Sequence, residues 1–161
     1  MKIIALDVGN KTIGVAVCDG LEISARPVTT IRRKGELESE VQELQDIIKK
    51  ENVEKVVVGL PLNMDGSEGE QAKLTKEFVE QIKEFIKLPF EFTDERLTTF
   101  AAEERLVGKG MKKSNMKSVI DQEAAAVILQ SYLNKSYQER RRKELFSQND
   151  SEDLNDSEDF S

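Results

Sequence analysis

Acidic residues occupy three places in the sequence where carboxylates could bind a metal or act as an acid or base. Asp7 ends an apolar run, residues 3–6, that is typical of a buried strand. Asp94 and Glu95 directly follow a second strand pattern, and Asp121 opens a predicted helix. Carboxylate oxygens are the ligands that Mg²⁺ and Mn²⁺ prefer. Such a set predicts a site for two divalent ions ~4 Å apart, which activate water and stabilise the leaving oxygen in phosphodiester hydrolysis.

Asp94 and Glu95 cannot both serve this site. Successive strand side chains point to opposite faces of a sheet, so at most one of the two shares the face of Asp7. A plainer interpretation pairs Glu95 with Arg96 on the surface before a helix. The residues alone leave this choice open.

Asp121 shares a predicted helical face with Ala124, Ala125 and Ile128, which has the composition of a core-facing stripe. A carboxylate on that stripe would be desolvated unless it is paired or bound to metal. The plainer interpretation is that Asp121 favours the positive end of the helix dipole.

The segment DVGNKTIG, residues 7–14, allows a phosphate cradle, a metal ligand or a plain hairpin. Gly9 and Gly14 have P-loop spacing, but the Lys and Ser/Thr that should follow are absent, and a strand follows instead of a helix. Gly9 therefore indicates a hairpin turn. An actin-like ATPase also opens with such a hairpin, but it normally needs two domains of this kind, and it stays an alternative.

Basic residues cluster close to Asp121. The loop 108–117 contains no acid, and a cationic loop beside carboxylates suits a polyanionic substrate because lysines neutralise phosphates without reading bases. A solvated loop is the plainer interpretation. A second basic run, residues 140–143, is expected to extend the nucleic-acid-binding surface of this loop or to contact the acidic tail. The basic residues 32–34 are predicted to form a solvated turn. The lysines of the loop are Lys109, Lys112, Lys113 and Lys117.

Composition removes whole classes of site. The chain has no histidine and one cysteine, which excludes Ser-His-Asp catalysis and zinc sites built from His or several Cys. Cys18 lies in a strand pattern and is predicted to be a core residue. The absence of any internal disulfide suits a reducing cytoplasm.

The elements that must position these residues form an α/β pattern. The length of 161 residues suits one domain, and no apolar run approaches the ~20 residues of a membrane span. An antiparallel three-strand meander followed by two helix-linked parallel strands predicts a five-stranded mixed sheet flanked by helices. Strands are expected at 2–8, 12–18, 23–31, 56–58 and 90–93. Helices are expected at 36–51, about 67–85, 99–108 and about 118–134, with a continuation of the last one through 145 as an alternative.

Charge divides the chain into two parts. Six of its 31 acids and none of its 24 basic residues lie in residues 147–161, so residues 1–146 are near neutral. With few apolar residues, this tail is predicted to be disordered and solubilising, or to compete with nucleic acid for a basic surface. The predicted organisation is a nuclease domain, 1–146, and a tail, 147–161.

Four motifs, taken in order, closely resemble the YqgF/RuvX family. They are LDVGNKTIGVAVCD, VVVGLPLNMDGSEG, FTDERLTT and IDQEAAAVIL, and they frame most of residues 1–134. The resemblance implies an RNase H-like fold and a bacterial cytoplasmic nuclease. It implies resolution of Holliday junctions in DNA recombination, or maturation of the 5′ end of precursor 16S ribosomal RNA in ribosome biogenesis.

Carried over by position, the resemblance implies that Asp7, Glu95 and Asp121 hold the metal. The family often has arginine where Thr12 stands, so a contact by that arginine is not carried over. Related resolvases place an acidic residue near the position of Gly59, so Glu95 would supply that ligand from the neighbouring strand.

The expected function is therefore a Mg²⁺- or Mn²⁺-dependent endonuclease on structured RNA or branched DNA. The lysines of 108–117 would contact phosphates, and Arg96 would orient one. A junction resolvase needs two active sites, which is compatible with a homodimer, although no residue pattern identifies a dimer face. The alternative is a non-catalytic nucleic-acid-binding or ribosome-assembly module with the same fold.

Overall fold

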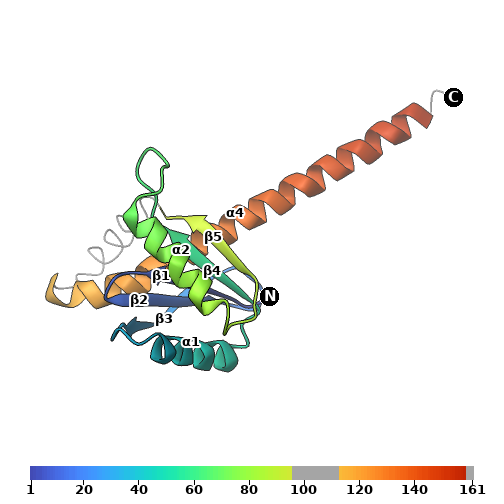
Figure 1. Cartoon of the computed structure of the whole chain (residues 1–161). Coiled ribbons are helices and arrows are strands. Elements are labelled where there is room, and N and C mark those ends of the chain that lie inside the picture. The colour runs from blue at the N-terminus through green and yellow to red at the C-terminus, as the bar shows by residue number, and fades with distance from the viewer. Residues whose placement is uncertain (96–112, 159–161) are drawn as a thin grey trace.

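The protein is an α/β structure with one central sheet (Figure 1). The computed structural model describes residues 1–95 and 113–158, with side chains described for 1–95 and 123–148. The expected helix 99–108 lies outside these ranges. The strands are β1 (Ile3–Val8), β2 (Thr12–Cys18), β3 (Ala25–Arg32), β4 (Lys55–Leu60) and β5 (Phe90–Asp94), and the helices are α1 (Leu37–Glu51), α2 (Glu70–Ile82) and α4 (Lys113–Glu158).

The sheet has the predicted mixed topology, with strand order β3-β2-β1-β4-β5. The pairs β1–β2 and β2–β3 are antiparallel, whereas β4 pairs in parallel with both β1 and β5. Gly9 turns the hairpin, where its amide donates to the carbonyl of Thr12 at 2.8 Å. The carboxyl ends of β1, β4 and β5 therefore lie at the same end of the sheet, where the sites of α/β proteins usually lie.

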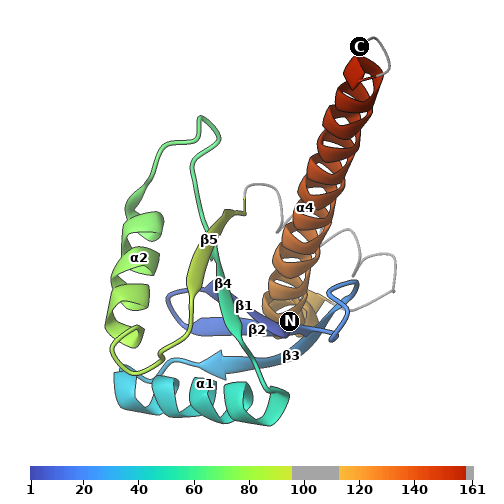
Figure 2. The same cartoon turned by 90° about the vertical axis from the view of Figure 1, so that its right-hand side faces the viewer.

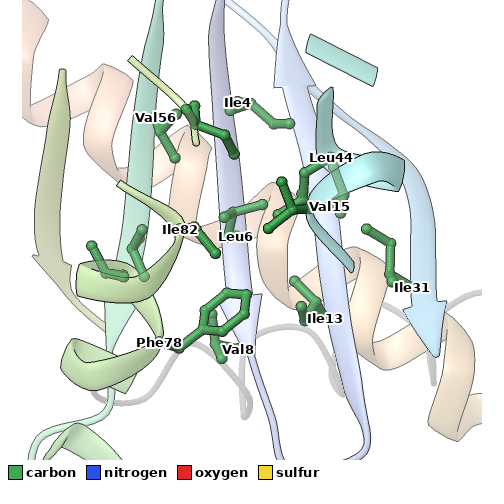
Figure 3. Packing of buried hydrophobic residues seen from close by; sticks show 14 of the residues in the cluster. Ile4, Leu6, Val8, Ile13, Val15, Ile31, Leu44, Val56, Phe78 and Ile82 are labelled. Atoms are coloured by element: carbon green, nitrogen blue, oxygen red, sulfur yellow. The ribbon is translucent and has the colours of Figure 1, made fainter. Parts of the chain in front are cut away.

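Large apolar side chains fill the face of the sheet that α1 and α2 cover (Figures 2 and 3). Alternate residues of β1 and β2 point to this face, because side chains alternate along a strand. They pack against Leu44 of α1 and Phe78 and Ile82 of α2. The strand residues of this layer include Ile4, Leu6, Val8, Ile13, Val15, Val17, Val56 and Val58.

The opposite face, covered by α4, is built from smaller residues. Ala5, Ala16 and Cys18 meet Ala125 and neighbouring apolar residues of α4 in a second buried cluster. Small side chains on both surfaces allow the helix to lie close to the strands. The predicted core stripe of this helix and the core position of Cys18 are both confirmed.

Helix α4 extends beyond residues 118–134, as the alternative with a continuation through 145 expected, and it goes on to Glu158 as a lone projection from the body (Figures 1 and 2). Its inner part is tied to β3 and the loop before it by Gln130, whose side chain accepts from the amide of Ala25 at 3.0 Å and donates to the carbonyl of Ile23 at 2.9 Å. In the described ranges no helix is long and apolar enough to cross a membrane.

Candidate active site: a carboxylate pair beside Gly59

Asp7 lies on the face of the sheet that α4 covers. Ile3 and Ala5 belong to the α4-side cluster, and strand alternation places Asp7 on the same side. Asp7 is half-buried and pairs across the hairpin with Gly14, which has no side chain to cover it. Its carboxylate therefore stands near the carboxyl end of a central strand, as the sequence predicted.

Glu95 reaches the same place from the edge of the sheet. It directly follows β5, and its amide continues the ladder by donating to the carbonyl of Leu60 at 3.2 Å. Its half-buried side chain forms a hydrogen bond with that of Asp7. Two of the three predicted ligands are thus in direct contact, although 87 positions separate them in the numbering of the sequence.

Gly59 makes this contact possible. Strand β4 runs between β1 and β5, and the side chain of Glu95 lies over it. A Cβ atom at Gly59 would stand 2.6 Å from Oε2 of Glu95 and 2.6 Å from Cδ1 of Ile128 on α4. Both distances are far below van der Waals contact, so a side chain at position 59 would have to displace the ends of the Glu95 and Ile128 side chains.

Charge makes the contact costly when both groups are ionised. Burial, the negative charge of Asp7 and the hydrogen bond to Asp7 raise the pKa of Glu95 from 4.5 to about 8, and Asp94 adds to this effect. The raised pKa favours the protonated Glu95 carboxyl, whose O–H donates a hydrogen bond to Asp7. A cation bound between the two groups would replace that proton.

The pair fits a hard divalent cation by donor type. Carboxylate oxygens suit Mg²⁺ and Mn²⁺, and two groups already held within hydrogen-bonding distance can both reach one ion. Among side chains within residues 1–95 and 123–148, no group of three or more His, Cys, Asp or Glu converges on one point. A third ligand would have to come from elsewhere in the chain.

Asp121 lies on the described backbone of α4, three residues before Ala124, which is buried against the sheet. Its side chain is outside the described set, so its predicted role as third ligand stays a prediction. Glu123, which sequence reasoning did not single out, is a further buried carboxylate on this part of α4.

Asp94 differs from Glu95 in orientation. Phe90 and Phe92 pack on the α1 and α2 side, and alternation places Asp94 on that side too, with an exposed side chain. Glu95, not Asp94, makes the contact with Asp7.

The predicted substrate contacts fall mostly outside the described residues. Arg96, Lys109 and Lys112 lie beyond them. Lys113 and Lys117 lie on the first turns of the α4 backbone, and their side chains are not described. Their proximity to Asp121 along one helix is the part of that prediction that the backbone supports.

One expectation was wrong. Arg33, predicted to lie in a solvated turn, is half-buried on the back of the hairpin and donates to the carbonyl of Gly9 at 2.8 Å. Its Nε atom also donates to Oε1 of the buried Glu40 at 3.1 Å. No signal in a run of three basic residues shows which of them turns inward.

Known proteins share this fold. A Thermus thermophilus RuvC in complex with a Holliday junction substrate superposes with a TM-score of 0.52 at 14% identity, covering 80% of this chain and 91% of that one. The yeast mitochondrial Holliday junction resolvase superposes with a TM-score of 0.55 at 10% identity, covering 91% of this chain and 83% of that one. At these identities the likeness shows the fold, which is the predicted RNase H-like one.

Sequence relatives are much closer. A protein of Caldanaerobacter subterraneus named "Putative pre-16S rRNA nuclease" is 50% identical over 135 residues, which are 83% of this chain and 96% of that one. A protein of Clostridium kluyveri with the same name is 45% identical, over 84% of this chain and 98% of that one. The family model described as "RuvX: Holliday junction resolvase" matches residues 1–135. The chain therefore belongs to the RuvX family.

Proposed function

We propose that the protein is a metal-dependent endonuclease that hydrolyses phosphodiester bonds in structured nucleic acid. The observation that carries the proposal is the contact between Asp7 and Glu95 over Gly59. Two carboxylates brought together at the carboxyl ends of central strands are unfavourable unless a proton or a cation lies between them. Membership of the RuvX family and the names of its relatives support the same activity.

Asp7 and Glu95 would hold Mg²⁺ or Mn²⁺, with Asp121 as the third ligand. A divalent cation supplies an activated water and stabilises the leaving oxygen. The protein residues orient that chemistry. Strand β1 fixes the position of Asp7, and the missing side chain at Gly59 of β4 sets how closely Glu95 approaches Asp7. Lys109, Lys112, Lys113, Lys117 and Arg96 would hold the phosphate backbone near the pair.

The finer proposal is that the substrate is precursor 16S ribosomal RNA, whose 5′ end the enzyme would mature in the cytoplasm, or a four-way DNA junction. The names of the relatives favour the first, and the description of the family as a Holliday junction resolvase favours the second. Cleavage of a junction would call for two active sites, and hence for a homodimer.

Residues 136–161 lie beyond the part that matches the family. Helix α4 is continuous through Glu158 and so includes most of the acidic tail. A lone helix that is polar on all sides is marginal in water, and acids near its C-terminus oppose its dipole. We therefore keep residues 1–146 as the proposed nuclease domain and 147–161 as a separate acidic tail.

The test is cleavage of precursor 16S RNA and of a four-way DNA junction, each with Mg²⁺ or Mn²⁺. Asp7→Asn and Glu95→Gln should each lower the rate at least ~100-fold, because removal of even an outer-shell partner costs 10–100-fold. Asp46→Asn is the matched control, since Asp46 is exposed on α1 and bonds to Gln42 at 2.9 Å.

If wild type cuts neither substrate with either metal, or if Asp7→Asn cuts as fast as wild type, the enzyme proposal fails. Salt-sensitive binding without metal would then favour the non-catalytic module, and stabilisation by nucleotide would favour the ATPase-like alternative.

A further inference from the structure

Arg33 connects the back of the hairpin to both helices on the α1 and α2 face. Its guanidinium donates to the carbonyl of Gly9 at 2.8 Å and to Oε1 of Glu40 at 3.1 Å, and lies 4.7 Å from the ring centroid of Phe78. Glu40 is buried on the first turn of α1, and Phe78 is buried on α2. We call Arg33, Glu40 and Phe78 the back clamp.

The contacts of the back clamp converge on the residues that directly follow Asp7. Besides the guanidinium bond to Gly9, the amide of Arg33 donates to the carbonyl of Lys11 at 2.8 Å. The side chain of Gln71 on α2 donates to the carbonyl of Val8 at 3.3 Å. Carbonyls of three of the four residues after Asp7 are thus bound, that of Lys11 in continuation of the strand ladder and those of Val8 and Gly9 by side chains from the face opposite to the carboxylate pair.

A fixed backbone matters there because the position of the Asp7 carboxylate depends on the segment that follows it. Asp7 faces a second carboxylate, and the segment that follows it turns at a glycine. A carboxylate at the end of a strand keeps its position only if the backbone that follows it is fixed. Groups that fix a ligand in this way typically change metal affinity by 10–100-fold.

We infer that Arg33 is a positioning residue for the Asp7–Glu95 pair, acting through the carbonyl of Gly9 from the opposite face of the sheet. This inference rests on the proposed function, because it assigns Arg33 to the preorganisation of the same metal site. Arg33 does not touch metal or substrate. Arginine suits the role because its rigid fork donates in two directions at once, to Gly9 and to Glu40.

The surroundings of Arg33 provide an unusually direct test. Arg33 lines an open cleft of about 440 Å³ between the hairpin tip, α1 and α2, together with Asn10, Leu37 and Leu74. Truncation of Arg33 would leave a hole continuous with this cleft, next to Glu40 and the ring of Phe78. A free guanidinium ion can diffuse into that hole and restore the missing donors.

The experiment measures the Kd of Mn²⁺ by calorimetry, the rate of RNA cleavage, and the urea unfolding midpoint in EDTA. Arg33→Ala should weaken Mn²⁺ binding about 10-fold or more. Guanidinium at about 10 mM, far below denaturing concentrations, should restore most of that loss in Arg33→Ala and change nothing in wild type. Arg26→Ala is the matched control, because Arg26 forms a comparable bond of 2.7 Å to Glu51 away from the hairpin.

Arg33→Ala leaves Glu40 buried without its arginine and so tests stability as well as position. The double variant Arg33→Met/Glu40→Gln removes both charges and keeps the side-chain volumes similar. It should fold and should still bind Mn²⁺ about 10-fold more weakly than wild type.

The outcomes separate the two proposals. If wild type binds Mn²⁺ and cleaves, but both Arg33 variants bind Mn²⁺ within twofold of wild type, Arg33 only stabilises the fold and the inference is overturned. Loss of affinity without guanidinium rescue, in step with the loss of stability, overturns it too. If wild type neither binds Mn²⁺ nor cleaves, the proposed function has failed and the inference fails with it.

Discussion

The two faces of the sheet surround a glutamate side chain with opposite kinds of partner. On the α1 and α2 face, Glu40 is buried against the guanidinium of Arg33. On the α4 face, Glu95 lies against a second carboxylate, Asp7, and the pKa of Glu95 rises to about 8. Arginine neutralises the charge of the first glutamate within the fold. Two adjacent carboxyl groups have no such neutralising partner in each other, so the second pair favours binding of a cation.

The two faces of the sheet also differ in the size of the side chains that pack there. Branched and aromatic side chains fill the first face, and alanine, cysteine and glycine line much of the second. Burial of large apolar side chains is the main source of stability. Small residues contribute less to stability, but they let α4 lie close to the sheet and let the side chain of Glu95 cross over Gly59. The first face thus buries more large apolar side chains, and the second combines its own buried cluster with space for a site.

The largest expected effect tests the packing of the α1 and α2 face. Leu44→Ala on α1 should lower the free energy of unfolding by about 2–5 kcal/mol, because it opens a cavity in close-packed surroundings. Leu44 is 1% exposed, whereas the control Leu21 is 78% exposed, and Leu21→Ala should cost about 0.5 kcal/mol or less. Urea unfolding measures both, and equal losses would contradict the contrast.

On the α4 face, adding a side chain at Gly59 should lower the activity more than truncating a side chain would. Gly59→Ala should lower the cleavage rate about 10–100-fold, because its Cβ displaces Glu95 from Asp7, an effect comparable to loss of a ligand-orienting group. Gly20→Ala is the control, since a Cβ there meets nothing within 4 Å. Steady-state cleavage with Mn²⁺ measures the effect, and an unimpaired Gly59→Ala enzyme would show that Glu95 need not cross β4.

The pH dependence of stability should reveal the acid–acid contact. Between pH 4.5 and about 8 folded Glu95 keeps a proton that the unfolded chain has released, so stability in EDTA should fall as pH rises through this window. The slope contributed is up to about 1.4 kcal/mol per pH unit. Thermal or urea unfolding of wild type and Glu95→Gln measures it.

Glu95→Gln should flatten that slope and stabilise the metal-free protein above pH 7. Glu80→Gln, at an exposed position of α2, is the control and should keep the wild-type slope. Identical slopes in wild type and Glu95→Gln would show that Glu95 ionises normally beside Asp7.

The smallest expected effect lies outside both faces. Deletion of residues 147–161 removes six acids and should tighten nucleic-acid binding a few-fold at low salt, with the difference vanishing at high salt. Fluorescence anisotropy with labelled RNA measures it. Unchanged affinity at low salt would leave the tail as a solubilising appendage.

Local periodicity predicted most of the fold, because strand alternation and the glycine turn are encoded by neighbouring residues. It also placed Asp7 at a strand end. The roles of Gly59 and Arg33 could not be predicted in this way. The space at Gly59 matters only because β4 lies between β1 and β5, and the inward turn of Arg33 depends on a buried glutamate and a phenylalanine ring that α1 and α2 bring to it.

The close passage of Glu95 over Gly59 also has an evolutionary consequence. A side chain at position 59 and a glutamate crossing from position 95 compete for one volume, so a homologue can use one route or the other to place its second carboxylate, but not both. Positions 59 and 95 should therefore covary as an either–or pair. A change from one arrangement to the other would require substitutions at both positions. A side chain added at position 59 alone would block Glu95, and loss of Glu95 alone would leave the site without its second carboxylate.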